Sequence, residues 1–246
     1  MVKAFIVAVV FWGSIAGTWK LATILSAPAP LSDNQKARVT NLGDLPRYHD
    51  ANAGLPQDPD RVVFFGDSIT FRWDLWESFH NRNYLNRGIG GQTTGDMLVR
   101  FRQDVINVRP KTVVILAGIN DIGEHNIGGD RNEEHKLENI ESNIETMAEL
   151  AELHGIRPVF LSVIPVHFYA RVGQYLSKVI PARLIVEQNK WMKSFCEEHH
   201  YQYIDVYSAM LDERGMLKRD LSEDGVHPNA AGYAVMAQVF SKEFHP

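Results

Sequence analysis

The 246-residue sequence has a single cysteine, Cys196, and no excess of basic residues. One thiol cannot form a disulfide within the chain. Cys196 lies in a helical-looking run, where we expect a small buried hydrophobic residue. The net charge of -5 leaves no basic surface for nucleic acid, which argues against that class of partner. Repeats and low-complexity stretches are absent as well, and 45% hydrophobic residues suffice for one globular domain.

A long hydrophobic run is also missing. The most apolar stretch, residues 4–17, is shorter than the ~20 residues that span a bilayer comfortably. Lys3 precedes it, and Ser14-Ile15-Ala16 has the small residues that a signal peptidase prefers. Residues 1–25 are therefore predicted to be a signal peptide or an N-terminal membrane anchor. A first helix packed on the domain is the alternative.

Export follows from the signal-peptide or anchor prediction. The protein would be periplasmic, secreted or anchored facing outside, and this segment would be its only contact with a membrane. Residues 26–60, rich in Pro, Asp, Asn and Gly, are predicted to be a linker and lead-in segment. The folded domain is predicted to cover residues 61–246.

From residue 61 onward, short apolar runs alternate with helical patterns. Strands are predicted at 62–65, 112–117 and 158–163, with weaker ones at 84–87 and 201–205, and helices at 94–108, 135–154, 182–198 and 230–243. Continuously apolar strands indicate burial on both faces, as in a parallel sheet. The pattern predicts a three-layer α/β fold whose site lies at the carboxyl ends of the strands.

Ser68 follows the first predicted strand in the block Gly66-Asp67-Ser68-Ile69. At a helix start its N–H would point outward, where an oxyanion needs a donor. A serine there is also explained as the N-cap of the next helix. Because a serine hydroxyl needs a base to become a nucleophile, the block alone favours the cap.

Asp224 and His227 could supply that base. Their D-x-x-H spacing places the carboxylate and the imidazole on one tight turn. An aspartate that accepts the Nδ1 proton would leave Nε2 free to act as the base. The alternative is an ordinary loop histidine beside a capping aspartate.

Two further segments could stabilise an oxyanion. Gly91 ends the block 86–91, and without a Cβ its N–H can approach a substrate closely. Asn120, in the block 118–121, could donate from its side-chain amide. A flexible turn and an Asx turn are the alternatives, and we expect Asp121 to support its loop. Together with a nucleophile and a base, these donors meet the requirements of acyl transfer.

With these four blocks, residues 62–240 resemble the SGNH hydrolases, also called the GDSL family. The resemblance implies a flavodoxin-like α/β/α sandwich with a mainly parallel five-stranded sheet, and hydrolysis of esters or thioesters without a metal or cofactor. The implied nucleophile is Ser68, the general base His227 and its orienter Asp224, while the implied oxyanion hole is Ser68 N–H, Gly91 N–H and Asn120. The first block reads G-D-S-I instead of G-D-S-L, which we expect to be harmless. Residues 181–191 also look like the single-domain acylhydrolases and acetylesterases.

Side chains that flank the four blocks are candidates for the wall of an acyl pocket. They are Ile69, Phe71, Trp73, Ile164, Val166 and Val226, and each could instead belong to the core. We expect short strand-end loops and no long apolar lid, which favours short acyl groups such as acetyl on a carbohydrate or other small alcohol. A lysophospholipase or thioesterase acting on longer chains is the closest alternative.

Two functions from other classes stay open. One is a non-catalytic carbohydrate-binding protein on the same fold, which the intact Ser68, Asn120, Asp224 and His227 argue against. The other is a metal-dependent hydrolase. Its ligands would come from His125, His135, His154, His167, His199 and His200, which form no H-E-x-x-H or H-x-x-E-H arrangement. We therefore expect no metal and no cofactor.

Overall fold

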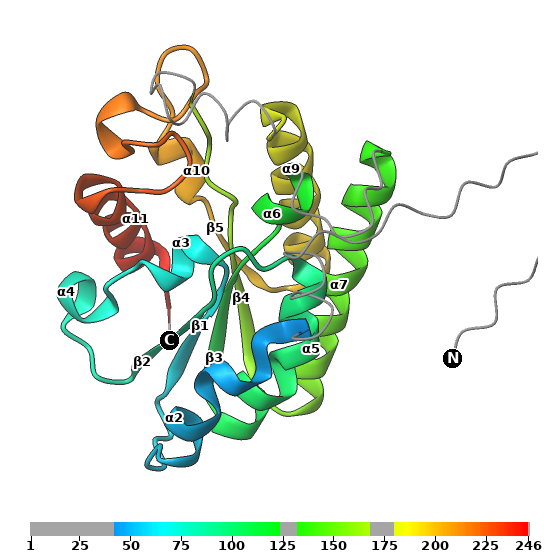
Figure 1. Ribbon diagram of the computed structural model, residues 1–246, viewed down its shortest axis with the longest axis vertical. Helices are drawn as coiled ribbons and strands as arrows, with labels where there is room; N and C mark the ends of the chain where they lie inside the picture. The colour runs from blue at the N-terminus through cyan, green and yellow to red at the C-terminus, as the bar shows by residue number, and fades with distance from the viewer. Residues whose placement is uncertain (1–41, 124–131, 168–179, 246) are drawn as a thin grey trace, which may run out of the picture.

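The computed structural model describes residues 42–123, 132–167 and 180–245. Its strands form one sheet in the order β2-β1-β3-β4-β5, and every neighbouring pair is parallel (Figure 1). The strands are β1 Val62–Gly66, β2 Tyr84–Gly88, β3 Thr112–Leu116, β4 Arg157–Leu161 and β5 Gln202–Ile204. This order is the flavodoxin-like one, so the predicted fold class is confirmed.

The central strands are buried on both faces. Every residue of β1 and β3 is buried, which explains their unbroken apolar sequences. The edge strands β2 and β5 are only partly buried. Their mixed composition follows from this exposure and made them the weaker predictions.

Helices cover both faces of the sheet (Figure 1). One face carries α5 Thr94–Asp104, α7 Glu133–Leu153 and α9 Ala182–His199, and the other carries α3 Ser68–Phe71, α4 Leu75–Phe79, α10 Val206–Ala209 and α11 Ala230–Glu243. Short helical turns lie between these elements: η2 Ile106–Val108, α6 Ile119–Ile122 and η3 Arg219–Leu221. The predicted helix 94–108 is therefore wrong at its end, because α5 stops at Asp104 before η2.

The residues before β1 pack on the domain. η1 Leu42–Tyr48 and α2 His49–Ala53 lie against α5. The Tyr48 hydroxyl donates to Gly88 O at 2.6 Å, and Asn52 Nδ2 donates to Asp104 Oδ1 at 2.7 Å. The prediction of a linker over 26–60 is thus wrong for the described part of that segment.

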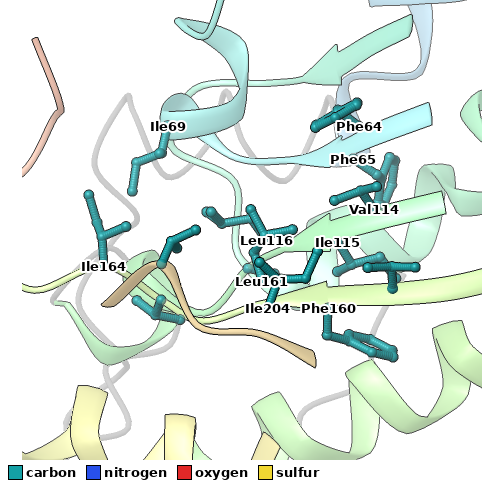
Figure 2. Close-up of a cluster of buried hydrophobic side chains, with 14 of the residues drawn as sticks. Phe64, Phe65, Ile69, Val114, Ile115, Leu116, Phe160, Leu161, Ile164 and Ile204 are labelled. Atoms are coloured by element: carbon teal, nitrogen blue, oxygen red, sulfur yellow. The ribbon is translucent and has the colours of Figure 1, made fainter. Parts of the chain in front are cut away.

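The core lies between the sheet and its helices. Figure 2 shows Phe64, Phe65, Ile115 and Phe160 within one buried cluster. Cys196 is buried too, and burial raises the pKa of its thiol to about 12, as expected of a structural cysteine.

The predicted N-terminal signal or anchor lies outside the described residues. Within 42–123, 132–167 and 180–245, no helix combines the length and the apolar character needed to cross a membrane.

Candidate active site

Ser68 is the first residue of α3, directly after β1. Asp67, not Ser68, is the N-cap of this helix, and its Oδ1 accepts the Ile69 N–H at 2.8 Å. The Ser68 hydroxyl is therefore not needed for capping. Its Oγ lies 2.9 Å from His227 Nε2. The helix-cap alternative for Ser68 is thus wrong.

His227 and Asp224 lie in the loop before α11. Asp224 Oδ2 is 2.7 Å from His227 Nδ1, and Asp224 Oδ1 accepts the N–H groups of Val226 and His227 at 2.9 and 2.8 Å. Burial would raise the pKa of Asp224, but the hydrogen bonds from His227 and Val226 lower it to about 2. An ionised carboxylate can only accept, so Nδ1 carries the proton and the Nε2 lone pair faces Ser68.

Ser222 and His167 hold the shape of this loop. Ser222 Oγ accepts the Gly225 N–H at 2.9 Å and donates to His227 O at 2.7 Å, while His167 Nε2 lies 3.0 Å from Ser222 O. Gly225 has a φ of +87°, and a Cβ there would lie 2.3 Å from His167 O. Ser222 was not predicted, because a serine inside a loop carries no distinctive pattern.

The other two predicted segments meet beside Ser68. A Cβ at Gly90 would lie 3.8 Å from Ser68 Cβ, and Asn120 Nδ2 donates to Gln92 O at 2.9 Å. Gly91, between them, has a φ of +77°, which favours glycine. Ser68, as the first helical residue, has no acceptor for its N–H within its own helix. The predicted donors are therefore grouped at one end of the sheet.

Asp121 connects the segment that carries Asn120 to the start of α5. Its carboxylate accepts the Thr94 N–H at 3.0 Å and the Thr94 hydroxyl at 2.6 Å, which fixes the start of α5 against α6. Burial raises the pKa of Asp121 to about 6 and that of Asp67 to about 7. Asp121 thus supports its loop, as the sequence indicated.

Three of the candidate pocket residues are core residues instead. Trp73 packs on Phe64 and Phe79, with ring centroids 5.6 Å away in each case. Ile164 and Val166 are buried, and Figure 2 shows Ile164 in the core cluster. The prediction that these residues line an acyl pocket is wrong, because their side chains are used for packing.

The remaining candidates differ in exposure. Ile69 and Val226 are buried in the same core cluster, so the pocket prediction is wrong for them too. Phe71 is 44% exposed, and the Arg47 guanidinium lies 5.1 Å from its ring centroid. Arg47 comes from the lead-in segment, whose position beside the site the sequence did not indicate.

Two of the connections that follow strands are long. β4 ends at Leu161 and α9 begins at Ala182, while β3 and α7 are separated by residues 117–132. The expectation of short strand-end loops is therefore wrong. Residues 124–131 and 168–179 of these connections lie outside the described part of the chain.

The metal alternative finds no support in the described part of the chain. There, no group of three or more His, Cys, Asp or Glu side chains is placed to hold a metal ion. His125 lies outside the described residues, and His167 is buried behind the loop of His227.

Residues 64–235 match the model of the GDSL-like lipase/acylhydrolase family. The chain belongs to this family. A solved structure of a candidate acylhydrolase from Bacteroides fragilis is 36% identical, with a TM-score of 0.71, and the likeness covers 81% of this chain and 95% of the other. The fold and the four blocks thus agree with membership of the GDSL-like family.

Two curated relatives are similar over shorter stretches. The uncharacterized lipoprotein YqeF of Bacillus subtilis is 34% identical over 121 residues, which are 43% of this chain and 49% of the relative. The acetylxylan esterase of Geobacillus stearothermophilus is 26% identical over 162 residues, which are 65% and 70% of the two chains. This GDSL-like chain thus spans about half the length of the first relative.

Proposed function

We propose that this protein is a serine esterase that removes short acyl groups, most simply acetyl, from carbohydrates or other small alcohols. The observation that carries the proposal is the chain of contacts from Ser68 Oγ through His227 to Asp224, at 2.9 and 2.7 Å. Such a chain converts an unreactive hydroxyl into a nucleophile. The family to which the chain belongs supports the same chemistry.

The first half of the reaction acylates Ser68. Ser68 Oγ bonds to the ester carbonyl carbon while its proton passes to His227 Nε2. The resulting oxyanion receives hydrogen bonds from the N–H groups of Ser68 and Gly91 and from the Asn120 amide. His227 then gives the proton to the leaving alkoxide as the ester C–O bond breaks.

Water completes the cycle. His227 Nε2 takes a proton from a water molecule whose oxygen bonds to the acyl carbon. The same donors hold the second oxyanion. The bond to Ser68 Oγ then breaks, Ser68 recovers its proton from His227, and the carboxylic acid leaves. Asp224 stays ionised throughout and stabilises the imidazolium.

The preference for short acyl groups rests on one observation. The similarity to an acetylxylan esterase supports an acetylated carbohydrate as substrate. Loop length gives no support for this preference, because two of the strand-end connections are long.

A series of p-nitrophenyl esters from acetyl to long acyl chains, with acetylated xylooligosaccharides beside it, tests the proposal. We expect kcat/KM to be highest for acetyl and Ser68→Ala to lower kcat by at least about 10³-fold in a folded protein. Full activity in Ser68→Ala would overturn the esterase assignment. A maximum at long chains would instead favour a lysophospholipase or thioesterase.

We also propose that the protein is exported. The apolar stretch 4–17 and the similarity to a Bacillus subtilis lipoprotein support this location. Fractionation of cells that express the full chain tests it, and recovery of the protein only with the cytosol would contradict it.

A further inference from the structure

Gln92 lies between the two segments that carry the proposed oxyanion donors. It follows Gly91 directly, and its backbone carbonyl accepts the Asn120 Nδ2 hydrogen at 2.9 Å. That bond uses one hydrogen of the Asn120 amide and directs the other away from Gln92. The Gln92 backbone therefore orients the Asn120 amide directly and adjoins Gly91, the other proposed donor.

The Gln92 side chain is buried and bonded at both ends. Its Oε1 accepts from Arg100 Nε at 2.6 Å, and its Nε2 donates to Gly43 O at 3.0 Å. The donor at one end and the acceptor at the other fix the orientation of the amide. Gln92 is thus held between α5 and the lead-in segment η1.

Arg100 extends this connection to the nucleophile. It is fully buried, and its Nη2 donates to Gly66 O at 3.0 Å, two residues before Ser68. Its Nη1 donates to Arg87 O at 2.9 Å, near the end of β2. The Arg100 guanidinium therefore contacts the ends of β1 and β2 as well as the Gln92 side chain.

Gly91 needs such an external restraint. A Cβ at Gly91 would touch nothing within 4 Å, so local packing does not restrain this residue. Glycine also has the widest conformational freedom of any residue. An oxyanion donor, however, must be within hydrogen-bond distance of the developing charge before the reaction begins.

We propose that Gln92 is the positioning residue of the oxyanion hole, and that Arg100 and the carbonyl of Gly43 hold it in place. The inference rests on the proposed esterase function. It gives the lead-in segment a part in catalysis, because η1 supplies one of the two anchors of the Gln92 side chain.

Gln92→Leu removes both anchors at nearly constant volume. We expect kcat, measured with p-nitrophenyl acetate and divided by the number of sites that a fluorophosphonate titrates, to fall about 10–100-fold. KM should stay within about twofold, since the donors act mainly in the transition state. A merely structural role would lower the titrated fraction and the Tm but leave kcat per site unchanged, which would overturn the proposal.

Gln103→Leu is the matched control. Gln103 lies on the same helix as Arg100, and its Nε2 donates to Leu45 O of the same lead-in segment at 2.5 Å. The Gln103 side chain also donates to Asp104 Oδ1. Neither of these two hydrogen bonds involves the loop 90–92 or α6. We expect this variant to keep kcat per site, and a loss equal to that of Gln92→Leu would contradict a specific role for Gln92.

A double-mutant cycle with Asn120→Ala separates positioning from general damage. Asn120→Ala alone should cost about 10²–10³-fold in kcat. Because Gln92 positions both donors, Gln92→Leu should cost at least about threefold less in that background than in the original protein, and the remaining cost comes from Gly91. An undiminished cost there would overturn the inference.

A second variant, Gln92→Glu, tests the proposal if Gln92→Leu does not fold. Gln92→Glu keeps the acceptor for Arg100, with a charge that pairs with the guanidinium, but replaces the donor to Gly43 O by an oxygen that this carbonyl repels. We therefore expect a folded protein with kcat per site reduced at least about threefold. Unchanged kcat in folded Gln92→Glu would overturn the proposal. Ser68→Ala distinguishes the two levels: activity that survives it refutes the esterase itself, whereas a Ser68-dependent activity that ignores Gln92 refutes only this inference.

Discussion

At the scale of single residues, Asp224 has two separate tasks. Its Oδ1 shapes the loop by accepting backbone N–H groups, and its Oδ2 accepts the proton-bearing Nδ1 of His227. Only the second task requires a negative charge. Replacing the carboxylate by an amide therefore separates catalysis from folding.

Asp224→Asn should keep the loop, because the amide oxygen can still accept the two backbone N–H groups. An amide N–H₂ facing His227 would force Nδ1 to accept and move the imidazole proton to Nε2, which then cannot take the proton of Ser68. We expect kcat for a short-chain ester to fall roughly 10³–10⁴-fold with an unchanged Tm.

Asp205→Asn is a suitable control for Asp224→Asn. Asp205 caps α10 by accepting the Ser208 N–H at 3.0 Å and has no part in the proposed triad. This variant should keep its kcat. If Asp224→Asn retained more than about a tenth of the activity, the tautomer role of Asp224 would be refuted.

Asp67 predicts a pH dependence of stability. Its carboxyl is fully buried, Oδ2 has no hydrogen-bond partner among the described residues, and burial raises its pKa from 3.8 to about 7. At a pH between these two pKa values, the folded protein holds the Asp67 proton more often than the unfolded chain does. The contribution of Asp67 to stability therefore falls as pH rises from about 4 to about 7.

Asp67→Asn should remove this contribution, since an amide can accept the Ile69 N–H but does not ionise. We expect the Tm of Asp67→Asn to exceed that of the original protein at pH 8, with the difference shrinking toward pH 4. Thermal unfolding across this range measures it. A Tm difference that stays constant with pH would show that Asp67 does not titrate as inferred.

At the scale of elements, the end of β2 lies directly against α3. A Cβ at Gly88 would be 2.1 Å from Phe71 N and 2.6 Å from Phe71 Cα, so the two backbones touch. This contact sets how far the nucleophile helix stands from the segment that leads to Gly91. A side chain at 88 would have to push the two elements apart.

Gly88→Ala should lower the free energy of unfolding by about 3 kcal/mol, because backbone atoms have to shift to make room. Gly95→Ala, within α5, is the matched control. A Cβ there meets its nearest neighbours at 3.8 Å, and alanine favours a helix over glycine, so its stability should stay equal or rise. Denaturant unfolding compares the two, and equal midpoints would refute the predicted close contact.

At the scale of the whole molecule, periodicity was enough for the sheet and its main helices. β1 and β3 are apolar throughout because both of their faces are covered, which a sequence displays directly. The D-x-x-H spacing likewise restricts Asp224 and His227 to one turn. These features depend on neighbours in sequence, so they could be predicted.

Contacts between distant segments could not be predicted in the same way. Arg100 is a charged residue on a helix and would ordinarily be placed at the surface, yet it is fully buried because distant carbonyls satisfy it. Trp73 flanks the nucleophile block but turns into the core. The composition of the lead-in segment predicts a linker, whereas its hydrogen bonds with Gly88 and Asp104 fix it to the domain.

The separation of Ser68 and His227 by 159 residues has a consequence for synthesis. A ribosome completes β1 and its serine long before it makes the loop that carries the base. In the proposed mechanism, the serine remains an ordinary alcohol until that loop has emerged and α11 has packed. A nascent chain, or one cut short ahead of Asp224, would then be inert toward the esters of the cell that makes it.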